Sequence, residues 1–119
     1  MAEVKAFYGF KREERLKTRD DIREVFDRGR RFGCRGAKLF TLKNNLTRNR
    51  ICFALSRGFG TSVERNRTRR LGREAYRLLK PRLSGGHDLI LLVFPEKDAG
   101  LSFRNEQIRF LFTKAGLLQ

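Results

Sequence analysis

The chain has 119 residues, of which 28 are lysine or arginine and 13 are aspartate or glutamate, so its formal net charge is +15. That length favours a single domain over residues 1–119, and the positive charge favours an anionic partner, with nucleic acid the leading candidate. No apolar run approaches the roughly 20 residues of a membrane span, and the N-terminus lacks the apolar core of a signal peptide. We therefore expect a cytoplasmic protein with no membrane partner and with two reduced cysteines, Cys34 and Cys52.

The first predicted element is a short helix. Residues 1–17 are basic and without clear periodicity, so we expect an irregular N-terminal segment. Thr18 suits an N-cap, two aspartates follow in the first turn, and Gly29 suits a C-terminal stop. The pattern predicts a helix over residues 18–28. The apolar side of this helix carries Ile22, Val25 and Phe26.

Strands are predicted next. Residues 37–42 favour a strand that ends in a turn at Asn44–Asn45. Residues 50–56 alternate between apolar and small or polar side chains, which predicts a strand with one buried side. Residues 89–94 are continuously apolar, which is typical of a central strand.

Two longer helices are predicted in the second half of the chain. Thr61 and Glu64 have the spacing of a capping box, and Pro81 ends the resulting helix at about Lys80. Ser102 is the expected cap of the last helix. The apolar side of that helix carries Ile108, Leu111, Phe112 and Ala115. The order α-β-β-(β)-α-β-α, with the bracketed strand left open, predicts an α+β fold: an α/β sandwich with one central sheet of about four strands.

The helix from Thr61 carries a large excess of arginine. Its predicted apolar side holds Val63, Leu71, Ala75, Leu78 and Leu79. Two neighbouring columns hold Arg65, Arg69 and Arg73, and Asn66, Arg70 and Arg77. Like charges four residues apart destabilise a helix by a few tenths of a kcal/mol per pair, whereas guanidinium groups suit bidentate contact with phosphate. We therefore expect nucleic-acid contact rather than an ordinary solvated face. For Arg67, which falls nearer the apolar side, packing over the core is the alternative.

RNA is favoured over DNA. The chain has 11 phenylalanines, and unpaired RNA bases stack on aromatic rings for about 1–3 kcal/mol each. The sequence shows no helix-turn-helix pair, zinc-ligand set or zipper that would indicate a DNA-binding module. Phe26 and Phe40 are candidates for base stacking, with packing in the core as the alternative.

At these residues the sequence resembles the protein subunit of bacterial ribonuclease P. The string RNRTRRLGREAYR, residues 65–77, is similar to the family signature R-N-R-x-[KR]-R-x-x-R-[EQ]-x-[FY]. Residues 55–60, LSRGFG, resemble V-S-K-K-x-G, and residues 15–29 match R-L…D-F-x-x-V-F-x-x-G. Residues 88–90 and 101–103 resemble the strand after the long helix and the start of the last helix. The resemblance covers about residues 10–115.

The resemblance implies a fold and a division of labour. It implies a left-handed βαβ crossover, which the usual handedness rule would not predict. It also implies a subunit of an endoribonuclease in which a large RNA hydrolyses precursor transfer RNA to give the mature 5′ end. The expected partners are this catalytic RNA and precursor transfer RNA, with no obligate protein partner. Mg²⁺ ions are expected to be held mainly by the partner RNA and the substrate.

Two binding surfaces are implied by position. The expected RNA-binding residues are Arg57, Arg65, Asn66, Arg67, Arg69, Arg70, Arg73 and Arg77. The cleft for the single-stranded 5′ leader is expected to be lined by Ile22, Phe26, Phe40 and Arg57. Three positions depart from the family pattern: Ile22 where Phe is usual, Gly58 where Lys is common, and Thr61 where Asn is common. One wall of the cleft is therefore expected to be aliphatic.

The residues themselves agree with a protein that has no catalytic side chain and no metal site. The one histidine, His87, is predicted in a turn beside Asp88, with no second catalytic partner by spacing. No carboxylate cluster resembles a two-metal site. Two alternatives are a structural RNA-binding protein of ribosomal type, which would not support cleavage of precursor transfer RNA, and a stand-alone nuclease, which would cleave without RNA.

Overall fold

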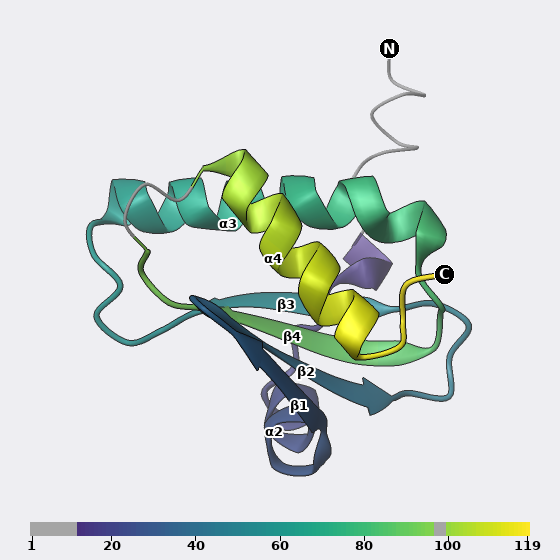
Figure 1. The fold of residues 1–119 in the computed structure, drawn as a ribbon. Helices are drawn as coiled ribbons and strands as arrows, with labels where there is room; N and C mark the ends of the chain where they lie inside the picture. The colour runs from purple at the N-terminus through teal and green to yellow at the C-terminus, as the bar shows by residue number, and fades with distance from the viewer. Residues whose placement is uncertain (1–11, 97–99) are drawn as a thin grey trace.

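The fold is seen in a computed structural model that describes residues 12–96 and 100–119. A four-stranded sheet lies between two layers of helix, with α3 and α4 on one face and α2 on the other (Figure 1). The elements are η1 (Arg12–Glu14), α2 (Arg19–Arg28), β1 (Arg30–Cys34), β2 (Ala37–Lys43), β3 (Arg50–Leu55), α3 (Ser62–Leu79), η2 (Lys80–Arg82), β4 (His87–Val93) and α4 (Leu101–Lys114). The predicted α+β class and element order are confirmed. The sheet has four strands, so the additional strand that the prediction gave in brackets is present.

The start of the chain is only partly described. Residues 1–11 of the predicted irregular segment lie outside the described residues. In its remaining part, η1 forms a turn of 3-10 helix, and Arg15 makes an isolated bridge with Ile51 at the start of β3. The prediction of irregular structure therefore misses this short turn.

The strands lie in the order β1-β2-β4-β3. β1 and β2 form an antiparallel hairpin, β2 pairs with β4 in the antiparallel direction, and β3 pairs with β4 in parallel. Parallel neighbours need a crossover connection, and α3 with η2 provides it. The left-handed crossover that the resemblance implies stays a prediction.

The alternation of side chains along the strands divides the core into two clusters. The larger cluster joins Leu39, Ile51, Leu89 and Leu91 of the sheet to Tyr76, Leu79, Ile108, Leu111 and Phe112 of the two long helices. On the opposite face, Val25 of α2 packs with Leu16, Phe40 and Ile90. Around this smaller cluster Ile22, Phe26 and several sheet residues are only half-buried. The face under α2 is therefore the less completely covered one.

The buried side of α3 differs from the prediction. Val63 and Leu78, expected on the apolar side, are 76% and 51% exposed. The buried positions are Thr68, Gly72, Ala75, Tyr76 and Leu79. At Gly72 a Cβ atom would lie only 3.1 Å from Cδ1 of Phe53, so the missing side chain lets the helix approach β3. Small and polar residues, which a search for apolar periodicity does not count, thus help to set this face.

The ends of the elements follow local signals with two exceptions. The Thr18 cap and the capping box of Thr61 and Glu64 are confirmed. The expected Ser102 cap is wrong, because α4 begins after Gly100 and has no side-chain cap. His87 begins β4 rather than lying in a turn. Within the described residues, no helix combines the length and apolar character that crossing a membrane requires.

Candidate RNA-binding site

The start of α3 is fixed by its capping box. The Glu64 backbone N–H donates to Thr61 Oγ1 at 3.1 Å, and the Thr61 backbone N–H donates to Glu64 Oε1 at 3.4 Å. Arg65 folds back over this turn, donating to the Gly60 carbonyl at 3.1 Å and to Ser62 Oγ at 3.2 Å. Arg65 thus supports the loop that leads into α3, in addition to the RNA contact predicted for it.

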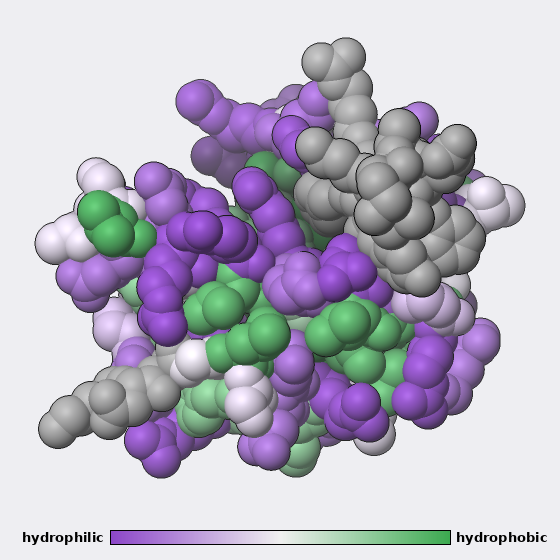
Figure 2. Space-filling view, turned by 90° about the horizontal axis from the view of Figure 1, so that it is seen from above, coloured by the Kyte–Doolittle hydropathy of each residue, from purple (hydrophilic) through white to green (hydrophobic). Residues whose placement is uncertain are grey.

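Beyond this turn, α3 presents a row of outward polar side chains. Asn66, Arg67, Arg70 and Arg73 are exposed, and we call these four residues the α3 ridge. Within the part of the chain that the structure describes, no acidic side chain pairs with Arg69, Arg70 or Arg73. Seen from the side of α3 and α4, the surface is mostly hydrophilic, with hydrophobic side chains in separate patches (Figure 2). The predicted columns of arginine are thus brought together, and their charge faces outward.

The far end of the predicted columns is different. Arg77 Nε donates to Glu74 Oε2 at 3.1 Å, and a second guanidinium nitrogen of Arg77 contacts Glu74 Oε1. These hydrogen bonds from Arg77 hold the pKa of Glu74 below its ordinary value. The charge of Arg77 is therefore compensated within the helix, unlike the charges of Arg69, Arg70 and Arg73.

Arg67 lies beside the first turns of α4. Arg67 is exposed, and its two predicted roles, contact with RNA and a stem packed over the core, stay predictions. Burial lowers the pKa of Arg104 in α4, the carboxylate of Glu96 acts against this shift, and the positive charge of Arg67 adds to it. The charge of Arg67 therefore acts on the first turn of α4.

Arg69 and Arg57 lie where α3 meets the edge of the sheet. Burial raises the pKa of the Cys52 thiol on β3, and the charge of Arg69 acts against that rise. Because Cys52 belongs to the α2 side of the sheet, the half-buried Arg69 reaches toward that side. Arg57 is exposed in the turn that follows β3, next to Gly58 with φ of +73°. The charge of Arg69 therefore acts on the sheet face that α2 covers.

A groove of about 680 Å³ runs beside α2. It is lined by Lys17, Arg19, Ile22, Arg23, Phe26 and Asp27. Two of the four residues predicted for the leader cleft, Ile22 and Phe26, are thus brought together with three cations. An apolar floor with a positive rim suits a strand of unpaired nucleotides, because bases can stack or pack on the floor while phosphates meet the rim.

The two predicted aromatic rings are placed differently. Phe40 is only 6% exposed and belongs to the core cluster of Val25 and Ile90. The half-buried Phe26 lies edge-on against it, with ring centroids 4.8 Å apart. Phe40 therefore offers little surface to a base, and its visible contribution is to hold the ring of Phe26 in place.

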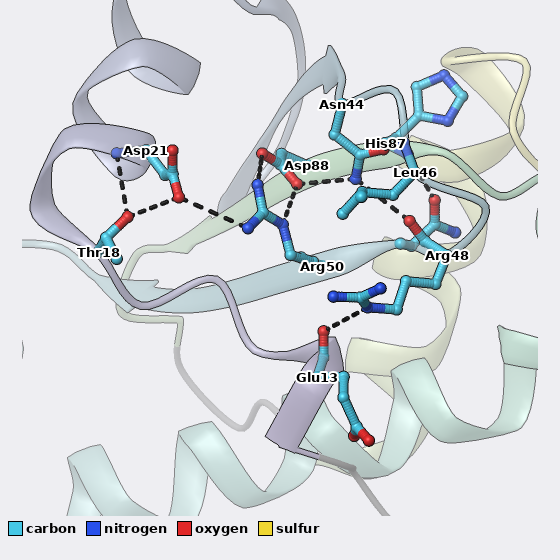
Figure 3. Close-up of polar contacts among 10 residues, drawn as sticks. Glu13, Thr18, Asp21, Asn44, Leu46, Arg48, Arg50, His87 and Asp88 are labelled. Carbon is cyan, nitrogen blue, oxygen red and sulfur yellow. Dashed lines mark hydrogen bonds and ion pairs between the residues drawn. The ribbon is translucent and has the colours of Figure 1, made fainter.

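An ionic network fixes α2 to the sheet beside this groove (Figure 3). Arg50 Nε and Nη2 donate to the two carboxylate oxygens of Asp88 at 2.7 and 2.6 Å. Arg50 Nη1 lies 3.5 Å from Asp21 Oδ2, which also accepts a 2.6 Å hydrogen bond from the Thr18 hydroxyl. Asn44 Nδ2 donates to Asp88 Oδ1 at 2.9 Å. The network thus joins β3, β4 and the first turn of α2.

This network was not predicted from the sequence. Asp88 has a side chain only 8% exposed, against 24% for Arg50. A carboxylate next to a continuously apolar strand is a signal that a cationic partner is needed. The sequence gives no local sign that the partner is Arg50, which comes from another strand.

The described residues offer little for side-chain catalysis. Burial lowers the pKa of His87, and its Nδ1 lies 3.1 Å from the Gly85 carbonyl oxygen. The neighbouring Asp88 is already engaged by Arg50. Among residues 12–96 and 100–119, no group of three or more His, Cys, Asp or Glu side chains is arranged to hold a metal ion. The surfaces described above consist of cations and one half-buried ring, groups that suit contact with RNA.

Comparison with known proteins decides the family. The family model described as Ribonuclease P matches residues 10–116. The chain belongs to the ribonuclease P protein family. It is 41% identical to the ribonuclease P protein component of Natranaerobius thermophilus over 106 residues, which cover 87% of this chain and 91% of that protein. It is 33% identical to the component of an Exiguobacterium species, covering 92% of this chain and 96% of that one.

Solved structures share the fold. The Staphylococcus aureus RNase P protein superposes with a TM-score of 0.81 at 21% identity, covering 89% of this chain and 98% of that chain. The Thermotoga maritima RNase P protein gives a TM-score of 0.75 at 24% identity, covering 85% and 96%. Membership of the ribonuclease P family makes the chain a subunit of an endoribonuclease, with a role in RNA binding and transfer RNA processing.

Proposed function

We propose that the chain holds two RNAs against each other. The α3 ridge binds the catalytic RNA of ribonuclease P, and the groove beside α2 binds the single-stranded 5′ leader of precursor transfer RNA. The catalytic RNA then removes the leader by hydrolysis of one phosphodiester bond, giving the mature 5′ end. The proposal implies a cytoplasmic protein that needs no further protein partner.

The observation that carries the proposal is the uncompensated charge of α3. Arg70 and Arg73 stand exposed on one helix without an acidic partner among the described residues. Neighbouring guanidinium groups repel one another, and phosphate oxygens are the ligands that match their planar, bidentate geometry. A dense array of phosphates is therefore the partner that compensates this helix.

The position of the second surface supports the leader assignment. The groove beside α2 has the half-buried Phe26 and Ile22 in its lining and Lys17, Arg19 and Arg23 as its cations. The charge of Arg69 acts on Cys52, which belongs to the sheet face that α2 covers. The leader of a precursor is single-stranded, and a groove with an apolar floor and several cations suits such a strand.

The chain contributes binding and orientation to the reaction. Hydrolysis needs an activated water, and the described residues offer no paired base and nucleophile to activate it. RNA and substrate phosphates would hold the Mg²⁺ ions, which supply Lewis-acid chemistry at the scissile phosphate. By fixing the leader in its groove, the protein lowers the entropic cost of bringing the bond to the catalytic RNA.

Reconstitution tests the function. We expect the protein alone to leave precursor transfer RNA intact, and we expect the protein together with a ribonuclease P RNA to cleave it at low salt, where the RNA alone is slow. Cleavage without RNA would indicate a protein nuclease. A failure to stimulate the RNA at every protein concentration would favour the ribosomal-type alternative.

A single substitution tests the groove. Phe26→Ala should weaken binding of precursor transfer RNA by about fivefold to thirtyfold, because one stacked base is lost, and should leave mature transfer RNA, which has no leader, unaffected. Leu78→Ala removes a side chain that is 51% exposed on α3 and serves as the matched control. Equal losses for precursor and mature transfer RNA would assign Phe26 to the fold instead of the leader.

A further inference from the structure

A second groove lies between α4 and the turn that joins β1 to β2. Its volume is about 360 Å³, and it is lined by Cys34, Arg35, Phe103, Glu106, Gln107 and Phe110. It shares no lining residue with the groove beside α2, which lies on the other face of the sheet. The function proposed above makes no use of it.

Two phenylalanine rings form the apolar part of this groove. Phe103 and Phe110 are seven residues apart on α4, so they lie on one side of the helix, about 10 Å apart along its axis. Phe110 is 51% exposed. The inner side of α4 is already filled by Ile108, Leu111 and Phe112, which are buried in the larger core cluster. Packing of the core therefore does not explain why residue 110 is a phenylalanine.

Cations surround the rings. The ammonium of Lys114 lies 5.6 Å from the centroid of the Phe110 ring. The side chain of Arg35, which is paired with Glu96, remains 77% exposed at the other side of the groove. Arg109 is exposed beside Phe110. Glu106 is the one acidic side chain in the lining, and a lone carboxylate can accept hydrogen bonds from an amino group of a base.

The groove is continuous with the field of the α3 ridge. The charge of Arg67 acts on Arg104, and the charges of Arg104 and Lys114 both act on Cys34 in the groove. Gln107, which also lines the groove, donates to the Arg35 carbonyl at 2.6 Å and so fixes α4 to the hairpin turn. Lys114 and Arg104 therefore bring positive charge to Cys34 at the groove.

We propose that this groove binds unpaired nucleotides of the same catalytic RNA that the α3 ridge holds. Bases stack on Phe103 and Phe110, and an adjoining phosphate is neutralised by Lys114. The choice of the catalytic RNA rests on the proposed function of the ridge. The leader is the less suitable occupant, because its groove lies on the opposite face of the sheet.

Charge and size argue against a second copy of the chain as the occupant. Two copies would each bring a formal charge of +15, which opposes association at low salt. A stable protein interface buries about 800 Å² on each partner, whereas a groove of about 360 Å³ accommodates one or two bases. RNA matches both the charge and the dimensions.

Cys34 provides a reporter inside the groove. In a Cys52→Ala background, which leaves Cys34 as the only thiol, the rate of alkylation by N-ethylmaleimide is measured at pH 8.5 with and without saturating ribonuclease P RNA. We expect the RNA to slow alkylation by about fivefold or more. An unchanged rate in the saturated complex overturns the proposal. Protection by precursor transfer RNA alone, and not by the catalytic RNA, overturns the assignment of the source.

Substitution of the exposed ring gives the second measurement. Phe110→Ala should weaken binding of the catalytic RNA by about fivefold to thirtyfold, the loss expected for one stacked base. Leu78→Ala, which removes an equally exposed side chain outside the groove, should change binding by less than about twofold. Circular dichroism melting of both variants establishes that they are folded. If the two variants bind the catalytic RNA with equal affinity, the proposal is wrong.

Two further controls separate this inference from the proposed function and from self-association. If Arg70→Ala/Arg73→Ala weakens RNA binding while Phe110→Ala does not, only the groove proposal fails. If neither variant changes binding, the proposed function of the ridge fails as well. Sedimentation equilibrium without RNA completes the test, because a doubled mass together with protection of Cys34 would make the groove an interface between two copies and overturn the RNA assignment.

Discussion

Arg50 and the arginines of the α3 ridge differ in what surrounds them. Arg50 is held by both carboxylate oxygens of Asp88 and lies within 3.5 Å of Asp21. Arg70 and Arg73 point outward and have no acidic partner among the described residues. Arg50 is thus held inside a network of carboxylates, whereas Arg70 and Arg73 have no counter-charge among the described residues.

The difference separates structural arginines from binding arginines. A part-buried guanidinium without a carboxylate would be unstable, so Arg50 and Asp88 depend on each other, and their contact fixes β3 against β4. An exposed guanidinium loses nothing by lacking a carboxylate, and it stays available to an external phosphate. If this division is correct, substitutions in the network should reduce stability, and substitutions in the ridge should reduce affinity for RNA.

The largest effect is expected in the network. Asp88→Asn keeps the shape of the side chain but leaves Arg50 with only the more distant carboxylate of Asp21, so the free energy of unfolding should fall by about 2–4 kcal/mol. Urea denaturation followed by circular dichroism measures the change. Asp27→Asn removes the same charge from an exposed position on α2 and should stay within about 0.5 kcal/mol of the parent chain. If both variants are equally stable, the network does not hold the fold together.

The ridge should respond in the opposite way. Arg70→Ala/Arg73→Ala should leave the free energy of unfolding unchanged or slightly higher, because repulsion along the helix is relieved. Binding of the catalytic RNA should weaken about tenfold to a hundredfold at low salt, and the slope of log K against log salt should become shallower by about 1.4–1.8, for two lost phosphate contacts. Fluorescence anisotropy across a series of salt concentrations measures both quantities.

The control for the ridge removes the same amount of charge elsewhere. Arg28 and Arg82 are exposed and lie outside α3. Arg28→Ala/Arg82→Ala lowers the net charge by the same two units, so a non-specific electrostatic effect would weaken RNA binding equally in both double variants. If the slope of log K against log salt is the same for the two double variants, the ridge is not part of the RNA interface.

The sequence predicts well those features of the structure that depend on residues close together in the chain. The caps at Thr18 and Thr61 depend on residues three positions apart, and the columns of arginine follow from the period of one helix. β1 is absent from the residue ranges that are predicted as strands. Its sequence, RRFGC, has neither a continuous apolar run nor apolar residues at each alternate position. It forms by backbone pairing with β2 at the edge of the sheet, which side-chain patterns encode weakly.

Features that depend on tertiary structure could not be predicted. Arg50 and Asp88 are 38 residues apart and meet only because β3 and β4 are neighbours in the sheet. Likewise, the burial of Phe40 beneath Phe26 depends on where α2 packs. The helical wheel placed Arg77 with the ridge columns, but only the side-chain geometry shows that Glu74 compensates it.

The smallest expected effect comes from that compensated arginine. Glu74→Gln removes the negative charge beside Arg77, so the net positive charge of α3 rises by one unit and affinity for the catalytic RNA should increase by about twofold to threefold. Because the Glu74 side chain is 40% exposed, its loss should reduce the free energy of unfolding by only about 0.3–0.5 kcal/mol at pH 7. Glu24→Gln, which breaks the exposed pair with Arg28 on α2, is the matched control and should not raise affinity.

The pH dependence of this stability difference has a definite sign. The hydrogen bonds from Arg77 lower the pKa of Glu74 in the folded chain below its ordinary value of 4.5. The pair therefore stabilises the fold above about pH 4.5, and its contribution is lost as the pH falls through the lowered pKa. Urea denaturation of parent and Glu74→Gln proteins should show a gap at pH 7 that narrows toward pH 3. A gap that widens on acidification would mean that Glu74 does not compensate Arg77, and Arg77 would then belong with the ridge.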